Sequence, residues 1–359
     1  MKLEVRLPQR GYAIHLKKGI LDGVGELLRQ TFQGPKVLIA TDSNVAPLYG
    51  ERVRNSLERA GYATQTFVFA AGEASKNMNT LMDVYGVLAD GHFTRSDAVL
   101  ALGGGVVGDL SGLAAATYLR GIRFYQVPTT LLAQIDSSVG GKVAVDLPQG
   151  KNLVGNFYQP GAVFIDPDTL STLPEAEVLG GFGEAVKHGA IMDENYFARM
   201  EGYQTIADLL KDSEKLIEGS LRVKIGMVEQ DERDTGARMA LNFGHTLGHA
   251  LEAATGFDRY IHGIAVAWGM AAVARGSVAM GWMKAEDARR LNALLERFHM
   301  IPEVNLSLDD LMGKAASDKK NFGGTLTLVV VPELGKHEFK RLSLEELRRF
   351  TKEALPWIS

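Results

Sequence analysis

Hydrophobic and polar residues follow two different patterns along this chain, and the change falls near residue 170. Before it, short apolar runs end in polar residues or glycine, as buried parallel strands do. These runs lie at 36–42, 97–102, 124–130 and 162–166. Stretches with helical periodicity separate them, at 47–61, 79–91 and 110–118. Because strands and helices alternate, this part predicts an α/β domain with a mostly parallel, doubly wound sheet.

From residue 171 onward, helical periodicity dominates. The helical stretches lie at 175–192, 206–229, 237–255 and 263–281, and one strand-like run lies at 325–331. A chain of 359 residues is long for a single core. We therefore predict two domains, an α/β domain over 1–170 and an all-α domain over 171–359. Binding sites often form between domains, so we expect the active site in the cleft between these two.

Composition restricts the class of protein. Hydrophobic residues make up 46% and charged residues 23%, as in ordinary globular proteins. The formal net charge is −4 and no basic tract stands out, which argues against a nucleic-acid partner. No apolar run reaches the roughly 18 to 20 residues of a membrane span. The start alternates like a strand and lacks a signal peptide's apolar core, so we expect a cytoplasmic enzyme. With no cysteine, any bound metal must use His, Asp or Glu.

A glycine-rich turn at 103–108 fits G-x-G-x-x-G and lies between a predicted strand and a predicted helix. Glycines there let the backbone approach a pyrophosphate, which the helix N-terminus attracts. The motif alone is weak, because an ordinary tight turn has the same pattern. The usual ribose-binding acid about 20 residues on is missing, since Arg120 and Arg123 occur there. Asp42, at the end of an earlier strand, is the better ribose candidate, so we expect a nucleotide in a variant register.

Two further turns combine glycine with lysine, at 139–142 and 150–155. Each offers backbone N–H groups and an ammonium, which suits a phosphate or a carboxylate. A single such turn is typical of any protein surface. Two of them flanking a short strand, after Thr129, Thr130 and Asp136, favour an anion site. By contrast, the turn at 72–76 is typical of a solvated loop with a helix cap, and the charged stretch at 318–321 of a plain loop.

A histidine pair and an acidic helix suggest a metal site. His245 and His249 are four residues apart, so they project from one face of a helix. Glu184, Lys187 and His188 share a face of a second predicted helix. Nitrogen and oxygen ligands of this kind, three in number with one open position, hold catalytic zinc. A single buried histidine is more often a core residue, so the pattern matters more than any one of them.

Glycines accompany these histidines and allow helices to pack closely around a site. They are Gly244, Gly248 and Gly263. We therefore expect Glu184 and His245 to bind a metal ion. Either His262 or His249 completes the set, because spacing alone does not choose between them, and His188 is expected to be structural.

Arg238 lies seven residues before His245, which itself lies four before His249. On a continuous helix over 237–255 these three side chains would share one face, and Asn242 would extend the same helix. The charge run at 231–234 before them is typical of a solvated helix end.

Together these motifs resemble the 3-dehydroquinate synthase family, within the sugar-phosphate cyclase superfamily. The match runs from about residue 42 to 320 in the same motif order, and its most specific segments are 103–109, 128–142, 150–152 and 241–245. The resemblance implies NAD, zinc that cobalt can often replace, and a homodimer. It also implies a phosphate-eliminating lyase of the shikimate pathway, which acts on 3-deoxy-D-arabino-heptulosonate 7-phosphate through transient oxidation, β-elimination, re-reduction, ring opening and aldol closure.

The resemblance also implies a role for individual residues. Metal ligands are Glu184, His245 and His262, which leaves His249 for the substrate. Groups near the reacting hydroxyls are His249, Lys187, Asp136 and Asp234. Cofactor-binding residues are Asp42, Glu73, Lys76, Gly103, Gly104, Gly105, Asp109, Thr129, Thr130 and Lys151. Substrate-binding residues are Lys142, Asn152, Lys224, Arg238, Asn242, Lys320 and, reaching the partner subunit's site, Arg120.

The chain departs from the family pattern at two positions. Asp234 stands where family members usually carry glutamate, and Ile264 where an acidic or amide residue commonly follows the metal histidine and glycine. Retention of Lys224, Arg238 and Asn242 favours the shikimate substrate over those of related cyclases. The alternatives are another cyclase, a metal-dependent polyol dehydrogenase, and a non-catalytic nucleotide-binding protein.

Overall fold

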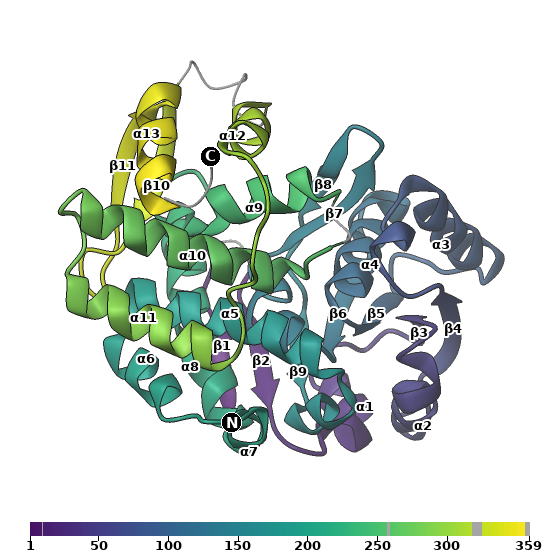
Figure 1. The fold of residues 1–359 in the computed structure, drawn as a ribbon. Coiled ribbons are helices and arrows are strands. Elements are labelled where there is room, and N and C mark those ends of the chain that lie inside the picture. The colour runs from purple at the N-terminus through teal and green to yellow at the C-terminus, as the bar shows by residue number, and fades with distance from the viewer. Residues whose placement is uncertain (9, 257–258, 318–324, 356–359) are drawn as a thin grey trace. The chain divides into compact units, whose positions relative to one another are not determined.

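The structure, a computed structural model, describes residues 1–8, 10–256, 259–317 and 325–355 (Figure 1). The chain divides into two compact units. The first comprises Met1–Leu173 and Lys224–Arg233, and the second comprises Pro174–Val223 and Asp234–Ser359. The sequence analysis placed one boundary after residue 170 and assigned 224–233 to the second domain, whereas this segment groups with the first unit. Among the described residues, no helix is both long and apolar enough to span a bilayer.

A seven-stranded sheet forms the centre of the first unit, in the order β1-β2-β9-β6-β5-β3-β4. Its strands are β1 (Lys2–Val5), β2 (Tyr12–Leu16), β3 (Lys36–Asp42), β4 (Ala63–Phe69), β5 (Ala98–Gly103), β6 (Arg123–Pro128) and β9 (Ala162–Ile165). Only β1 and β2 pair in antiparallel fashion, and the other neighbours are parallel. The predicted mostly parallel sheet is therefore confirmed.

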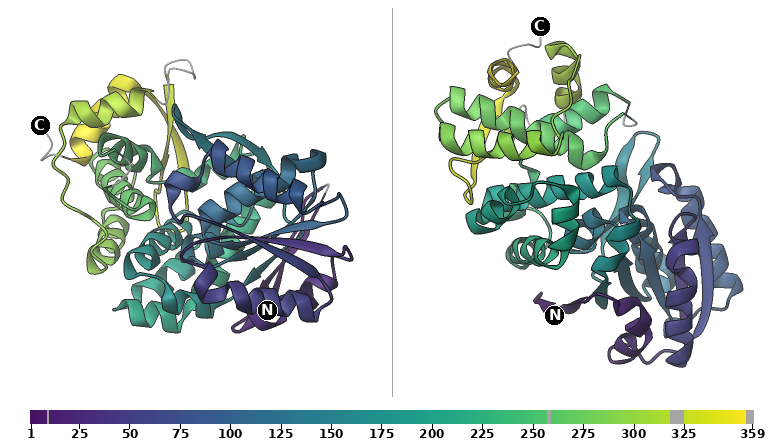
Figure 2. Two further views of the ribbon diagram at one scale, coloured as in Figure 1. Left: turned by 90° about the vertical axis from the view of Figure 1, so that its right-hand side faces the viewer. Right: turned by 60° about the horizontal axis from the view of Figure 1, so that its bottom comes forward.

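Helices cover both faces of the sheet, which explains why its inner strands β5 and β9 are apolar and buried throughout. The strands β1 and β4, at the two edges, are largely exposed. Along β3, Val37 and Ile39 face a core that includes residues of α1 (Val24–Arg29) and α2 (Glu51–Arg59). The alternate side chains, Leu38 and Ala40, face a second core that includes residues of α3 (Met78–Asp90) and α4 (Gly105–Thr117). Figures 1 and 2 show these helices on the two sides of the sheet.

A separate hairpin contains the segments that were predicted as two glycine-lysine turns. Its strands, β7 (Lys142–Leu147) and β8 (Gly150–Phe157), pair with each other in antiparallel fashion. The segment at 139–142 precedes β7, but the segment at 150–155, which the sequence analysis interpreted as a second turn, is part of strand β8. The turn of the hairpin lies at 148–149. A single bridge between Asn77 and Asp146 joins the hairpin to the start of α3. The hairpin is thereby held next to the turn at 72–76.

The second unit is mainly helical. Its helices are α5 (Glu175–Met192), α6 (Glu194–Glu201), α7 (Ile206–Lys211), α8 (Ser213–Gln230, whose residues from Lys224 group with the first unit), α9 (His245–Ala254), α10 (His262–Ala279), α11 (Ala285–Arg297), α12 (Leu308–Ser317) and α13 (Leu344–Ala354). It also contains a two-stranded sheet of β10 (Thr325–Val330) and β11 (Glu338–Ser343). The expected all-α domain is therefore corrected. Strand β11 was missed because its sequence, EFKRLS, is mostly polar and half exposed.

Two long predicted helices are interrupted. The stretch 206–229 divides at Asp212 into α7 and α8. The stretch 237–255 divides into a 3-10 helix, η7 (Ala237–Asn242), and α9, because Gly244 adopts a left-handed conformation with φ 80°. A Cβ at Gly244 would lie 2.6 Å from the carbonyl oxygen of Val266 in α10. The break therefore accompanies a close helix contact that only glycine permits.

This break overturns one expectation about the site. Arg238 and Asn242 lie in η7, whereas His245 and His249 lie in α9. Arg238, His245 and His249 therefore do not share one face of a continuous helix, and Asn242 does not extend α9, because the left-handed turn at Gly244 interrupts the helix.

Candidate functional site

Glycine contacts bring three helices of the second unit into backbone contact. A Cβ on Gly263 of α10 would lie 1.8 Å from the carbonyl oxygen of Gly180 in α5, and one on Gly248 of α9 would lie 2.9 Å from that of Ala265 in α10. Any larger side chain at Gly263 would push α5 and α10 apart. The expectation that glycines allow close packing here is confirmed, and the contacts place side chains from all three helices at one point.

Glu184 of α5 lies at this point. Its side chain is 2% exposed, and its Oε1 atom lies 3.6 Å from Nε2 of His245 and 3.6 Å from Nε2 of His262. No described residue donates a hydrogen bond to this buried oxygen, which would cost free energy if nothing else bound there. In a tetrahedral zinc site with ligand distances of about 2.0–2.1 Å, ligand atoms lie about 3.4 Å apart. Glu184 Oε1 therefore lies close to the spacing of a metal site from both histidine nitrogens.

The outer nitrogens of both imidazoles have partners that orient the rings. Nδ1 of His245 lies 3.2 Å from the carbonyl oxygen of Phe243. Nδ1 of His262 lies 3.3 and 3.4 Å from the two carboxylate oxygens of Glu252. When each Nδ1 carries the ring proton, each Nε2 keeps a lone pair toward Glu184, as metal-binding histidines require.

Electrostatics around the site keep His245 neutral. Burial, together with the nearby Lys187 ammonium, holds the pKa of His245 well below its usual value. Lys187, one helical turn from Glu184 on α5, donates a buried hydrogen bond to Glu184 Oε2. For His262, burial would lower the pKa, but the carboxylates of Glu252 and Glu184 raise it overall. A neutral His245 keeps a nitrogen lone pair with which it can bind a cation.

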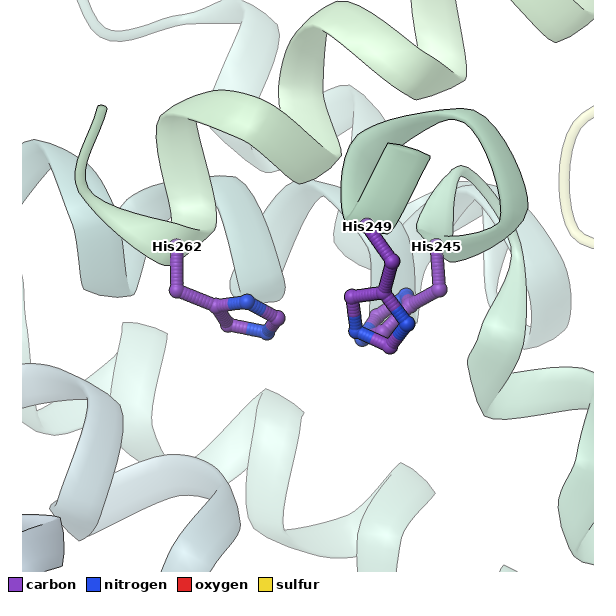
Figure 3. Close-up of side chains that lie close together, drawn as sticks. All are labelled: His245, His249 and His262. Carbon is purple, nitrogen blue, oxygen red and sulfur yellow. The ribbon is translucent and has the colours of Figure 1, made fainter. Parts of the chain in front are cut away.

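His249 completes a cluster of three histidine rings (Figure 3). Its ring centroid lies 5.2 Å from that of His245 and 5.7 Å from that of His262, and the three residues offer nitrogens within 4.8 Å of one another. The His249 side chain is the exposed member of the three. Glu184 Oε1 lies at the same distance, 3.6 Å, from Nε2 of His245 and of His262, as expected if these two are its co-ligands. His188, on the same helix as Glu184, is fully buried.

The glycine turn in the first unit provides a backbone site. Strand β5 ends at Gly103, Gly104 is the N-cap residue, and α4 begins at Gly105 without a side-chain cap. A Cβ on Gly103 would lie 2.5 Å from the side chain of Val107. The Thr129 N–H donates to the Gly103 carbonyl at 3.0 Å and holds the turn against the end of β6. An uncapped helix N-terminus behind small residues suits a phosphate group, so the turn fits a dinucleotide.

Asp42 ends strand β3, which neighbours β5 in the sheet. Its Oδ1 atom accepts hydrogen bonds from the backbone N–H groups of Asn44 and Val45, at 2.8 and 2.9 Å. These bonds hold the carboxylate in place at the carboxyl edge of the sheet. In doubly wound sheets, nucleotides bind at this edge.

Lys76 overturns the interpretation of residues 72–76 as a solvated loop. Glu73 is exposed, but Lys76 is buried, forms an ion pair with Asp109 Oδ2 at 2.6 Å, and donates to Asn152 Oδ1 at 2.6 Å. The helix cap was predicted correctly, since Asn77 accepts from the Thr80 N–H at the start of α3. The partners of Lys76 are distant in sequence, so no local pattern could have shown its burial.

Burial affects the two charges of this pair differently. It raises the pKa of Asp109 to about 6, against the opposing effect of Lys76. Burial alone would lower the pKa of Lys76, but the carboxylates of Asp109 and Glu73 raise it. A carboxyl group with a pKa of about 6 therefore lies in α4, next to the glycine-rich turn.

A second buried ion pair joins two of the other predicted site residues in the first unit. Lys224, near the end of α8, is 5% exposed and donates to Asp136 Oδ1. Asp136 lies in η5 (Ala133–Ser137), which begins three residues after Thr130. The sequence analysis placed Lys224 and Asp136 in different roles, and the structure brings them together.

The remaining predicted residues differ in exposure. Exposed side chains are Arg120, Lys142, Lys151, Asn152 and Asn242; Arg238 is buried, while Thr130, Asp234 and Ile264 are half-buried. Arg120, Asn152 and Asp234 have positive φ angles of 67°, 57° and 56°. Lys320 lies outside the described residues. Glu252, next to His262, was missed by the sequence analysis because its partner is ten positions away on another helix.

Comparison with known proteins identifies the family. Residues 66–180 match the family model described as "3-dehydroquinate synthase N-terminal", and residues 181–321 match the one described as "3-dehydroquinate synthase C-terminal". The chain belongs to the 3-dehydroquinate synthase family. A 3-dehydroquinate synthase from Clostridium acetobutylicum is 44% identical over 349 residues, which cover 97% of this chain and 98% of that protein.

Solved structures of related cyclases share the fold. A 2-deoxy-scyllo-inosose synthase, complexed with carbaglucose-6-phosphate, NAD⁺ and Co²⁺, has a TM-score of 0.86 and 25% identity and covers 98% of this chain and 99% of its own. A 2-epi-5-epi-valiolone synthase from Streptomyces hygroscopicus, with NAD⁺ and Zn²⁺ bound, has a TM-score of 0.88 and 24% identity, with 98% and 97% coverage. The second likeness shows the fold alone.

Proposed function

We propose that this member of the 3-dehydroquinate synthase family converts 3-deoxy-D-arabino-heptulosonate 7-phosphate to 3-dehydroquinate and phosphate. The observation that carries the proposal is the convergence of Glu184 Oε1 with Nε2 of His245 and of His262, an arrangement that fits a catalytic metal. The identity of 44% over nearly the whole length of the Clostridium acetobutylicum enzyme favours this substrate over a polyol or that of another cyclase.

Two bound groups would supply chemistry that amino acids lack. A divalent metal, zinc or cobalt, lowers the pKa of a coordinated alcohol, and NAD⁺ takes up a hydride and returns it within the same turnover, so it is not consumed. The solved 2-deoxy-scyllo-inosose synthase, with NAD⁺ and Co²⁺, supports both. In this chain we assign the metal to Glu184, His245 and His262.

We assign dinucleotide binding to the carboxyl edge of the first unit's sheet. The backbone of Gly103–Gly105 and the N-terminus of α4 hold the pyrophosphate, since small residues allow close approach there. Asp42 accepts from a ribose hydroxyl through Oδ2, because its Oδ1 already accepts two backbone N–H groups. Other residues assigned to the cofactor are Glu73, Lys76, Asp109, Thr129, Thr130 and Lys151.

The substrate carries a phosphate and a carboxylate, and the chain offers cationic and amide groups for both. Residues assigned to the phosphate are Lys142, Asn152, Asn242 and Lys320; those assigned to the carboxylate are Lys224 and Arg238. Charge-assisted hydrogen bonds of this kind hold both ends of a flexible molecule. Orientation of this type can lower a barrier by about 7–11 kcal/mol at most.

Proton transfer at the reacting hydroxyls is assigned to His249, Lys187, Asp136 and Asp234. The exposed His249 ring stands beside the two metal histidines, where it can exchange a proton with a bound hydroxyl. The substrate phosphate acts as the base for its own elimination. This explains why the chain needs anion-binding groups more than it needs many general bases.

We also propose assembly as a homodimer, in which Arg120 would reach the partner subunit's site. It lies in the turn η4 (Tyr118–Arg120), exposed beside Leu119, which is 41% exposed. Both residues have left-handed backbones, a strained arrangement that is common at functional positions. A cytoplasmic location stays a prediction from composition.

The test is phosphate release measured on the metal-loaded protein with NAD⁺ and 3-deoxy-D-arabino-heptulosonate 7-phosphate, together with absorbance of NADH. We expect one phosphate per 3-dehydroquinate formed, no net NADH, and loss of activity with a chelator. Sustained NADH production from glycerol-like alcohols would instead identify a polyol dehydrogenase. A protein that binds NAD⁺ but releases no phosphate, with or without metal, would be a non-catalytic binder.

A further inference from the structure

We propose that Glu252 is a positioning residue that holds the His262 imidazole in its metal-binding tautomer. The inference rests on the proposed metal site, because Glu252 would act on the metal only through the His262 ring. The residue is near the end of α9, whereas His262 is the first residue of α10. Its role therefore depends on the same close packing of helices that assembles the metal ligands.

The geometry of the pair is specific. The Glu252 side chain is 5% exposed, and its two oxygens lie 3.3 and 3.4 Å from Nδ1 of His262. The His262 side chain is 35% exposed, and its other nitrogen, Nε2, lies 3.6 Å from Glu184 Oε1. The ring thus joins two carboxylates, one at each nitrogen, and the Glu252 carboxylate holds the side that faces away from the metal position.

A neutral imidazole has one proton and two nitrogens, so only one tautomer can bind a metal through Nε2. A carboxylate beside Nδ1 favours the proton on Nδ1 and leaves the lone pair on Nε2. Its negative charge also makes Nε2 a stronger electron donor to a cation. Without Glu252, the partly exposed His262 ring would lose this preference and could rotate toward solvent.

The His245 ring is oriented by a different kind of hydrogen-bond acceptor. Its Nδ1 lies 3.2 Å from the backbone carbonyl of Phe243, in the extended residue between η7 and α9. This acceptor is neutral and belongs to the main chain. Only at His262, therefore, does a single side chain supply both the hydrogen-bond acceptor and the charge, which makes the proposal testable by substitution.

The experiment measures the zinc dissociation constant of the full chain by competition with a chromogenic chelator, without substrate. We expect Glu252→Ala to weaken zinc binding about 10- to 100-fold, as is usual when such a partner of a metal-bound histidine is lost. Glu252→Gln keeps an acceptor but not the charge, so its loss should be smaller. Asp287→Asn, which removes a buried carboxylate elsewhere in the second unit, is the matched control and should leave the affinity unchanged.

A second readout needs no metal. Nitrogen NMR of the metal-free protein at alkaline pH should show His262 protonated on Nδ1, and a shift toward the Nε2–H tautomer in Glu252→Ala. Unchanged zinc affinity and an unchanged tautomer in Glu252→Ala would overturn the proposal. Should that variant fail to fold, Glu252→Gln decides the matter by the same two measurements. Failure of the wild-type chain to bind zinc would overturn the proposed metal site itself.

Discussion

The glycine turn of the first unit and the histidine cluster of the second are built from different parts of the chain. In the turn, Gly103–Gly105 present backbone groups, and side chains are mainly excluded. In the cluster, Glu184, His245 and His262 present side-chain atoms, and glycines serve only to bring their helices together. One site is therefore local in sequence, and the other depends on tertiary packing.

This difference determines how each site should respond to substitution. A methyl group added in the turn would occupy space meant for a ligand, so binding should change while the fold does not. A methyl group added between the helices would collide with main chain, so the fold and the metal site should fail together. The following changes test this contrast, beginning with the largest expected effect.

Gly263→Ala should have the largest effect. Its Cβ would lie 1.8 Å from the Gly180 carbonyl oxygen, a main-chain atom that cannot rotate away. We expect the free energy of unfolding to fall by more than about 3 kcal/mol, at the upper end for overpacked cores, and zinc affinity to fall with it. Chemical denaturation and zinc titration measure both. Gly313→Ala on α12, with no atom within 4 Å of its Cβ, is the control; a Gly263→Ala protein as stable as this control would contradict the account.

The pH dependence of stability tests the role of Asp109, which lies next to the glycine turn. Its pKa is raised by burial from 3.8 to about 6, so the folded protein holds this proton more tightly than the unfolded chain does. The contribution to stability is therefore present below about pH 4 and is lost as the pH rises to about 6. Over this pH range the free energy of unfolding should fall by on the order of 2–3 kcal/mol. The ion pair between ionised Asp109 and Lys76 forms over the same range, but it offsets the cost of burying the charge only in part.

Asp109→Asn should remove this pH dependence. Unfolding curves between pH 4 and 8 should show the variant matching the wild type at the acid end and exceeding it near neutrality. The exposed Asp90→Asn serves as the control. A wild type that gains stability relative to Asp109→Asn as the pH rises would mean that attraction to Lys76 outweighs desolvation.

Gly105→Ala should have the smallest effect on stability and a selective effect on binding. Its Cβ would lie 3.2 Å from the Ser137 hydroxyl, a side-chain atom that can move. We expect NAD⁺ to bind on the order of tenfold more weakly, because the second glycine of the motif allows close approach of the pyrophosphate. Calorimetric titration measures this, with Gly86→Ala on α3 as the control. Unchanged NAD⁺ affinity would remove the turn from the proposed cofactor site.

The same difference explains what could be predicted from the sequence. The strand β3 and the helix α5 were predicted to the residue, because each is a largely buried apolar segment whose length and ends can be read from the local sequence. The glycine turn was found for the same reason. The break at Gly244 was missed, since its cause is the approach of Val266 from α10.

The histidine cluster could be predicted only in part. Spacing found His245 and His249 but could not choose between His249 and His262, because the choice depends on the position of Glu184 on a third helix. The resemblance to the family made that choice, which stays a prediction. The burial of Lys76 and the contact of Glu252 with His262 depend on packing between distant segments, which no local pattern records.

The most direct test of the proposed metal site is the zinc dissociation constant of four variants, Glu184→Gln, His245→Ala, His262→Ala and His249→Ala. The first three should each bind zinc at least about a hundredfold more weakly, since loss of a direct ligand should exceed the 10- to 100-fold effect of an outer partner. His249→Ala should bind zinc within about threefold of the wild type and lose activity instead. Equal losses for His249→Ala and His245→Ala, or full zinc affinity in His262→Ala, would contradict the assignment.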